Sequence, residues 1–88
     1  MARFETAGVD FTEMAASANA EGLYELGLIY ATGRNGLADL VAAHKWFNIA
    51  AFRGSEPAKA RREEVACEMD RSEIAAALRA ARDWITSH

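Results

Sequence analysis

The chain contains little of what strands, disulfide frameworks and membrane spans require. Among 88 residues there is one proline, Pro57, and one cysteine, Cys67, so no internal disulfide can form. The β-branched residues Val, Ile and Thr total eleven, whereas alanine, the strongest helix former, occurs twenty times. No apolar run approaches the roughly 20 residues of a membrane helix, and the first residues lack an apolar stretch of signal-peptide length. We therefore expect an all-α, cytoplasmic protein with no membrane segment.

Basic residues are also too few for a nucleic-acid-binding surface. The chain has ten Lys and Arg residues and thirteen Asp and Glu residues, so its formal net charge is −3. Phosphate-backbone binding needs a basic footprint, so we expect no nucleic-acid partner. The segment 70–78 resembles the first helix of a helix-turn-helix DNA reader, but the helical pattern continues to Ile85, where that motif needs a tight turn. A small nucleic-acid-binding regulator is therefore the least favoured alternative.

Apolar periodicity and capping residues predict four helices. They are expected over 19–32, over 38–53, over 58–69, and from the capping-box pair Asp70 and Glu73 to about Ile85. Asn19 and Ser55 suit N-terminal caps, and Gly33 and Gly54 suit helix stops. The residues expected in the core are Leu23, Leu26, Gly27, Ala43, Ala50, Val65, Met69, Ile74, Ala77, Leu78, Ala81, Trp84 and Ile85, with most of the aromatic cluster Tyr24, Tyr30, Trp46, Phe47 and Phe52.

The first residues admit two interpretations. The spacing of Phe11, Met14 and Ala15 fits a short helix, and a frayed tail that docks Phe4 or Phe11 on the rest fits equally well. We divide the single domain 1–88 into an N-terminal segment (1–18), a first helix pair (19–56) and a second helix pair (57–88).

The segment 20–58 carries small, aromatic and glycine residues in a recognisable register. Its first helix contains the spacing Ala-x-x-x-Tyr-x-Leu-Gly-x-x-Tyr, which ends at Tyr30. A glycine-containing loop follows, and the second helix reads Ala-x-x-Trp-Phe-x-x-Ala-Ala-x-x-Gly, which ends at Gly54. This pattern resembles the Sel-one-like repeat, a relative of the tetratricopeptide repeat. Leu40, where the family often has an aromatic residue, and Gly22, where it usually has alanine, depart from the pattern.

The resemblance implies a fold and a type of function. The fold is an α-α superhelix, or solenoid fragment, of antiparallel helix hairpins, with 57–88 as a degenerate repeat or capping helix pair. The function is that of a non-enzymatic adaptor or scaffold, which binds a peptide or protein partner on its helical repeat surface. By analogy with tetratricopeptide repeats, the first helix lines the concave face, and the residues expected there are Glu21, Tyr24, Leu28, Ala31 and Thr32.

A homo-oligomeric structural protein is the main alternative. Solenoids usually need at least three repeats to close their core, so one good repeat and one degenerate pair leave apolar ends uncovered. Either the N-terminal segment, with Phe4, Phe11 and Met14, covers one end, or a homodimer buries the same surface about a two-fold axis.

The residues that carry catalytic or metal chemistry are scattered. His44, Cys67 and His88 lack the spacing of a metal site. The pairs Glu63–Glu64 and Glu21–Glu25 are typical of a solvated helix face. Along the expected helix 58–69, the spacing predicts ion pairs of Lys59 with Glu63 and of Arg61 with Glu64. No phosphate loop or dinucleotide fingerprint occurs. We expect no enzyme activity, no cofactor and no metal.

Overall fold

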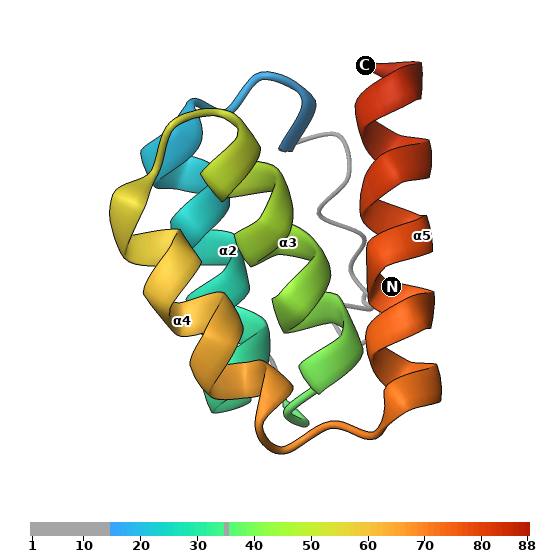
Figure 1. Cartoon of the computed structure of the whole chain (residues 1–88). Coiled ribbons are helices and arrows are strands. Elements are labelled where there is room, and N and C mark those ends of the chain that lie inside the picture. The colour runs from blue at the N-terminus through green and yellow to red at the C-terminus, as the bar shows by residue number, and fades with distance from the viewer. Residues whose placement is uncertain (1–14, 35) are drawn as a thin grey trace, which may run out of the picture.

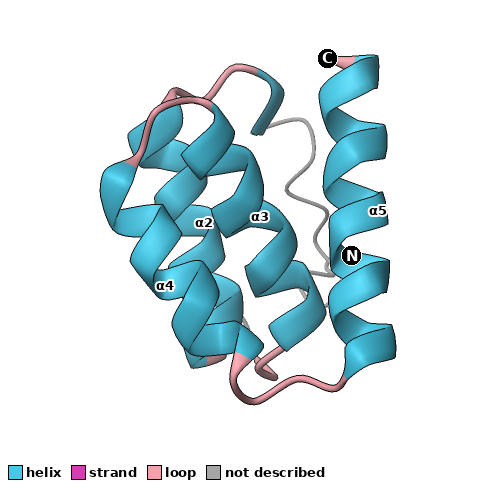
Figure 2. Ribbon diagram, viewed as in Figure 1, coloured by secondary structure: helices cyan, strands magenta, loops and turns pink. Residues whose placement is uncertain are grey.

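A computed structural model describes residues 15–34 and 36–88. Within these stretches the chain forms four helices and no strand, so the all-α prediction is confirmed. The helices are α2 (Ala20–Thr32), α3 (Leu40–Phe52), α4 (Glu56–Ala66) and α5 (Arg71–Ser87). Consecutive helices run in opposite directions, so α2 and α4 point one way and α3 and α5 the other (Figures 1 and 2). No helix in this part of the chain combines the length and the apolar character needed to cross a membrane.

Each helix begins at a polar side chain that accepts a hydrogen bond from the first turn. The predicted caps Asn19 and Ser55 accept from amides three residues onward, at 2.9 and 3.2 Å. In the predicted capping box, Asp70 Oδ1 accepts from the Glu73 amide at 2.8 Å, and Glu73 Oε1 accepts from the Asp70 amide at 2.9 Å. Asp39 caps α3, which therefore begins two residues later than expected. These contacts satisfy amides that have no partner within the helix, and so they fix where each helix starts.

Glycines end the first two helices, as predicted. Gly33 has φ of 75°, and its amide donates to the Ile29 carbonyl. Gly54, with φ of 110°, directly follows the last turn of α3. Residues with a side chain rarely adopt such angles, so the chain can turn sharply at these two positions.

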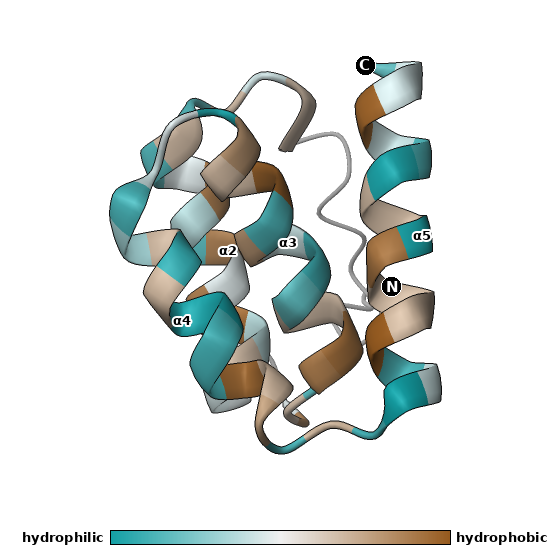
Figure 3. Ribbon diagram, in the orientation of Figure 1, coloured by the Kyte–Doolittle hydropathy of each residue, from teal (hydrophilic) through white to brown (hydrophobic). Residues whose placement is uncertain are grey.

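Helix α4 starts two residues before the expected position and ends three residues before it. Pro57 lies in its first turn, where a missing amide hydrogen costs nothing. Lys59 pairs with Glu56 at 3.1 Å, so the predicted pair of Lys59 with Glu63 is wrong. The predicted burial of Val65 is confirmed, and Figure 3 shows that most of the rest of α4 is hydrophilic.

Helix α3 lies at the centre and packs against α2, α4 and α5 (Figure 1). A helix packed on several sides needs apolar residues around most of its circumference. The sequence of α3 supplies them, and its buried apolar residues are Ala43, Trp46, Phe47, Ile49 and Ala50.

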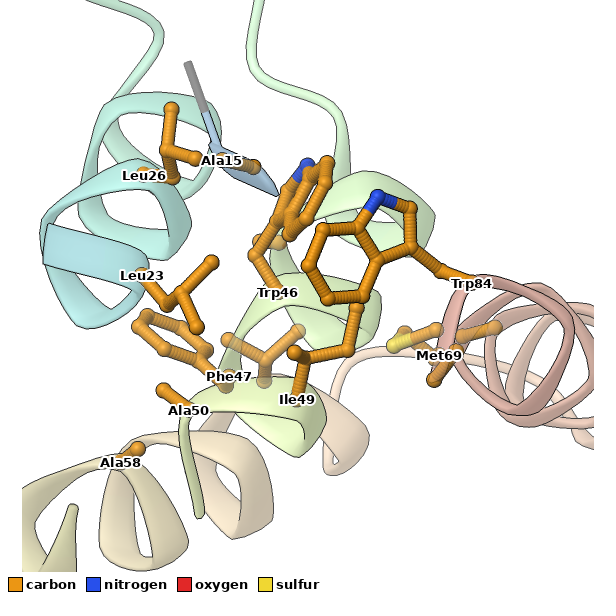
Figure 4. Packing of buried hydrophobic residues seen from close by; sticks show 14 residues of the cluster. Ala15, Leu23, Leu26, Trp46, Phe47, Ile49, Ala50, Ala58, Met69 and Trp84 are labelled. Carbon is orange, nitrogen blue, oxygen red and sulfur yellow. The ribbon is translucent and has the colours of Figure 1, made fainter. Parts of the chain in front are cut away.

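Helices α2 and α3 approach each other closely at Gly27. A Cβ atom built on Gly27 would overlap two ring carbons of Phe47, which is fully buried. On the α5 side, Trp46 meets Trp84 in a T-shaped pair with ring centroids 5.5 Å apart. Ala15, from the stretch before α2, is fully buried in the same cluster (Figure 4).

Two residues expected in the core are exposed. Phe52, at 67% exposure, is the last residue of α3 and projects beyond the surfaces that the neighbouring helices cover. Leu78 is 43% exposed because α5 buries a narrow stripe through Ala77, Ala81 and Trp84, and Leu78 lies beside that stripe. The predictions for Phe4, Phe11 and Met14 lie outside the described residues.

The contact between Gly27 and Phe47 gives a first testable prediction. Alanine normally favours a helix over glycine by about 1 kcal/mol. At position 27 we expect the opposite: Gly27→Ala should lower the free energy of unfolding by about 1–3 kcal/mol, because its methyl group overlaps the Phe47 ring. Urea unfolding followed by circular dichroism measures this change. The double variant Gly27→Ala/Phe47→Leu should lose less unfolding free energy than the sum of the losses of the two single variants. A Gly27→Ala protein as stable as the parent would contradict this packing.

Trp46 and Phe52 of α3 form a matched pair for a second test, because one ring is buried and the other is exposed. Trp46 is 3% exposed, so Trp46→Ala should cost about 3–5 kcal/mol of unfolding free energy. Phe52→Ala should change it by less than about 0.5 kcal/mol, because that ring lies mostly in solvent. The same urea titration compares them, and equal losses for both variants would show that the register of α3 is misassigned.

Candidate functional site

The five residues predicted to bind a partner lie along one face of α2, beside α4. The spacing of Glu21, Tyr24, Leu28, Ala31 and Thr32 places them on successive turns of the same helical side. Glu21 and Thr32 are exposed, and the other three are half-buried. Together with residues of α4 they line two hollows along the line where α2 and α4 meet. We call this line the α2–α4 seam.

The first hollow lies at the N-terminal ends of both helices and has a volume of about 470 Å³. We call it the N-terminal hollow. From α2 it includes Glu21, Tyr24 and Glu25, and from the start of α4 it includes Glu56 and Pro57. Three carboxylates therefore surround an opening whose less polar lining includes Tyr24 and Pro57.

The second hollow, of about 200 Å³, lies toward the C-terminal ends of the same helices. We call it the C-terminal hollow. Its apolar lining includes Leu28, Phe47 and Val65, one residue from each of α2, α3 and α4. Glu64 and Glu68 lie on the α4 side. This hollow therefore combines an apolar lining with carboxylates from one wall.

A hydrogen bond links α2 to α4 between the two hollows. Arg61 Nε donates to the Tyr24 hydroxyl oxygen at 3.3 Å, and Arg61 Nη1 lies 3.2 Å from Glu64 Oε1 in the predicted ion pair. The hydrogen bond to Tyr24 and the nearby Glu64 carboxylate raise the pKa of Arg61 above its ordinary value. The Tyr24 ring packs against Phe47 with centroids 5.8 Å apart. Tyr24 is therefore held by its ring to α3 and by its hydroxyl to α4.

Sequence reasoning missed the α4 half of the seam. Arg61 was expected only to pair within its own helix, and no role was expected for Val65 or Glu68 beside α2. Arg61 and Tyr24 are 37 positions apart, so no local spacing relates them. Recognising this half requires knowing that α2 and α4 lie side by side.

His44, Cys67 and His88, which were considered for metal or catalytic chemistry, do not line the seam, whereas the carboxylates of Glu21, Glu25 and Glu64 do. His44 is buried on α3, Cys67 is exposed at the end of α4, and the ring of His88 stacks on Trp84 at 4.3 Å. Among the described residues no group of three or more His, Cys, Asp or Glu side chains is arranged to hold a metal ion.

His44 is the one buried titratable side chain that lacks a hydrogen-bond partner at a ring nitrogen within the described residues. It is 3% exposed, and its Nδ1 atom is unpaired. Burial lowers the pKa of His44 below its ordinary value of 6.5, the positive charge of Arg62 lowers it further, and Glu63 partly opposes the shift. Folding therefore favours the neutral imidazole.

The lowered pKa of His44 predicts a loss of stability in mild acid. The unfolded chain binds a proton at this position below about pH 6.5, whereas the folded chain binds it only at lower pH. The free energy of unfolding should therefore fall as the pH drops below 6.5, by at most about 1.4 kcal/mol per pH unit. His44→Leu should reduce this dependence of the unfolding free energy on pH. Urea titrations between about pH 7.5 and about pH 5, above the range in which most carboxylates titrate, measure it. A slope unchanged by His44→Leu would contradict the prediction.

The pKa of Asp70 gives a second effect in a separate pH range. The hydrogen bonds that Asp70 accepts from Glu73 and Ser72 lower its pKa below the ordinary value of 3.8. The stability that the ionised Asp70 contributes is therefore lost only as the pH falls below that value. The two losses can therefore be measured independently.

Comparisons with known proteins assign no family to the chain. No family model matches it, and no curated protein or solved structure matches it either. The resemblance to the Sel-one-like repeat therefore remains a prediction from the residues of 20–58.

Proposed function

We propose that this protein is a non-enzymatic interaction module that binds a peptide segment of a partner protein along the α2–α4 seam. The observation that carries the proposal is that one helix from each of the two helix pairs contributes side chains to the same two hollows. Residues of α2 from the first pair and of α4 from the second pair enclose both hollows. Such a surface offers an apolar pocket with polar groups around it, which is typical of peptide-binding grooves.

The arrangement of the helices supports a solenoid-type origin for this surface. In a superhelix of helix pairs, the first helices of successive pairs lie side by side, and so do the second helices. Here α2 lies beside α4, and α5 packs on α3 (Figure 1). The close contact at Gly27 also agrees with a repeat whose two helices meet at small residues. We propose on this basis that residues 20–58 form a Sel-one-like repeat.

The arrangement of α5 does not favour the nucleic-acid alternative. Residues 71–87 form one unbroken helix, so the tight turn that a helix-turn-helix reader needs is missing from this segment. The homo-oligomer remains the other alternative, and it shares the prediction of a non-enzymatic role.

Selection from a random peptide library tests the proposed function. The full chain, immobilised through a C-terminal tag, should enrich a family of related peptides. Binding of a synthetic member should be lost in Leu28→Asp, since that change places a charge in the C-terminal hollow. Arg79→Ala, an exposed change on α5, should leave affinity within twofold. A melting curve for each variant controls for unfolding.

Two results would contradict the proposal. One is a library that yields no enriched family, and the other is peptide affinity that is insensitive to a folded Leu28→Asp variant. A replacement of Leu28 by the neutral Asn serves if the aspartate variant unfolds.

A further inference from the structure

We infer that the partner segment is basic, with an apolar anchor residue for the C-terminal hollow and an arginine or lysine for the carboxylates at each end of the seam. This inference rests on the proposed function and adds the chemistry of the occupant. It follows from three features of the seam: its charge, the lining of its smaller hollow and the distance between its two ends.

Carboxylates dominate the charge of the seam. Among the residues that line the two hollows there are five glutamates and one arginine. That arginine, Arg61, is already engaged by Tyr24 and Glu64. The seam therefore presents a net negative surface to any segment that lies along it, and charge complementarity favours a basic occupant.

Each hollow contains one carboxylate that has no ion pair within the part of the chain that the structure describes. Glu25 lies 3.7 Å from Arg34, and Glu56 lies 3.1 Å from Lys59, but these pairs are more than half exposed. Glu21 in the N-terminal hollow and Glu68 in the C-terminal hollow have no ion pair with any residue that the structure describes. A cation that approaches either glutamate therefore breaks no ion pair of that side chain with the described residues.

The apolar lining of the C-terminal hollow adds a second requirement. Leu28, Ala31 and Leu40, which are half-buried, line a volume of about 200 Å³ there together with the buried Phe47 and Val65. That volume is below the ~300–1,000 Å³ typical of a site for a drug-sized ligand, and it suits a single aliphatic side chain. Glu68 lines the same hollow, so an aliphatic anchor and an adjacent basic residue bind it together. A neutral or acidic segment with the same anchor would leave Glu68 unpaired or repelled.

The length of the seam sets the spacing. Glu21 and Leu28 are seven residues apart on α2, which corresponds to roughly 10 Å along the helix axis. An extended peptide covers that distance in about three residues. The expected motif is therefore a basic residue, two spacers, an aliphatic anchor and a second basic residue, in either chain direction.

Fluorescence anisotropy with synthetic peptides tests this chemistry. The probe is the labelled peptide Ser-Arg-Ala-Ser-Leu-Arg-Ser, with its reversed sequence as a second probe. The comparison peptides replace both arginines by glutamate or the leucine by serine. We expect the better arginine probe to bind at least about tenfold more tightly than either comparison peptide. The preference over the glutamate peptide should shrink as salt is added.

Two variants of the full chain form a matched control. Glu68→Lys and Asp83→Lys change the net charge equally, and both positions are exposed, but only Glu68 lines the seam. Glu68→Lys should weaken binding of the arginine probe by about tenfold, and Asp83→Lys should weaken it by less than twofold. Equal weakening by both variants would show that overall charge, and not the seam, governs binding, and it would overturn the inference.

The remaining outcomes separate this inference from the function on which it rests. In one outcome, neither arginine probe binds, but the library enriches neutral or acidic peptides whose binding is lost in the Leu28→Asp variant. The basic-partner inference is then wrong, and the proposed function stands. If the library enriches nothing, both are wrong.

Discussion

The contact between Gly27 and Phe47 determines how the other elements are placed. Without a side chain at Gly27, the Phe47 ring lies directly against the backbone of α2, and a single added carbon would overlap it. The same ring contacts Tyr24 and forms part of the lining of the C-terminal hollow. The close approach of α2 and α3 therefore also sets the depth of the pocket between α2 and α4. A change that pushed α2 away from Phe47 would alter the core and the seam together.

The central position of α3 explains why the remaining helices differ in character. Because α3 supplies apolar contacts in several directions, α4 and α5 each need only a narrow apolar stripe. Helix α4 can therefore be mostly charged, and Glu56, Glu64 and the following Glu68 lie along the α2–α4 seam. The proposed binding surface can thus be polar because α3 supplies much of the buried apolar surface of the core.

Local features of the fold could be predicted from the sequence, whereas relations between distant segments could not. The caps at Asn19 and Asp70 and the stop at Gly33 depend on side chains within a few residues, so their patterns were sufficient. The burial of Leu78 was predicted wrongly, because apolar spacing shows which faces of a helix can be buried but not how wide the covering partner is. The misassigned partner of Lys59 has a similar origin, since residues three and four apart compete on the same helix face.

The candidate site shows the same division. The α2 half was expected from a resemblance, and the structure brings those five residues together along one edge. The α4 half depends on which helices lie side by side, and a hydrogen bond spanning 37 positions leaves no signature in a single sequence. The carboxylates of Glu63 and Glu64 could be predicted from the sequence as part of a solvated face, and only the structure places Glu64 and Glu68 beside α2.

The central claim is that the two helix pairs form one binding surface along the α2–α4 seam. Nuclear magnetic resonance mapping of backbone amide shifts, during titration of the full chain with a selected peptide, tests it most directly. We expect the largest shift changes on both helices, near Tyr24 and Leu28 of α2 and near Arg61 and Val65 of α4, with little change around Arg79 on α5. Shift changes confined to α5, or to α2 without α4, would contradict it.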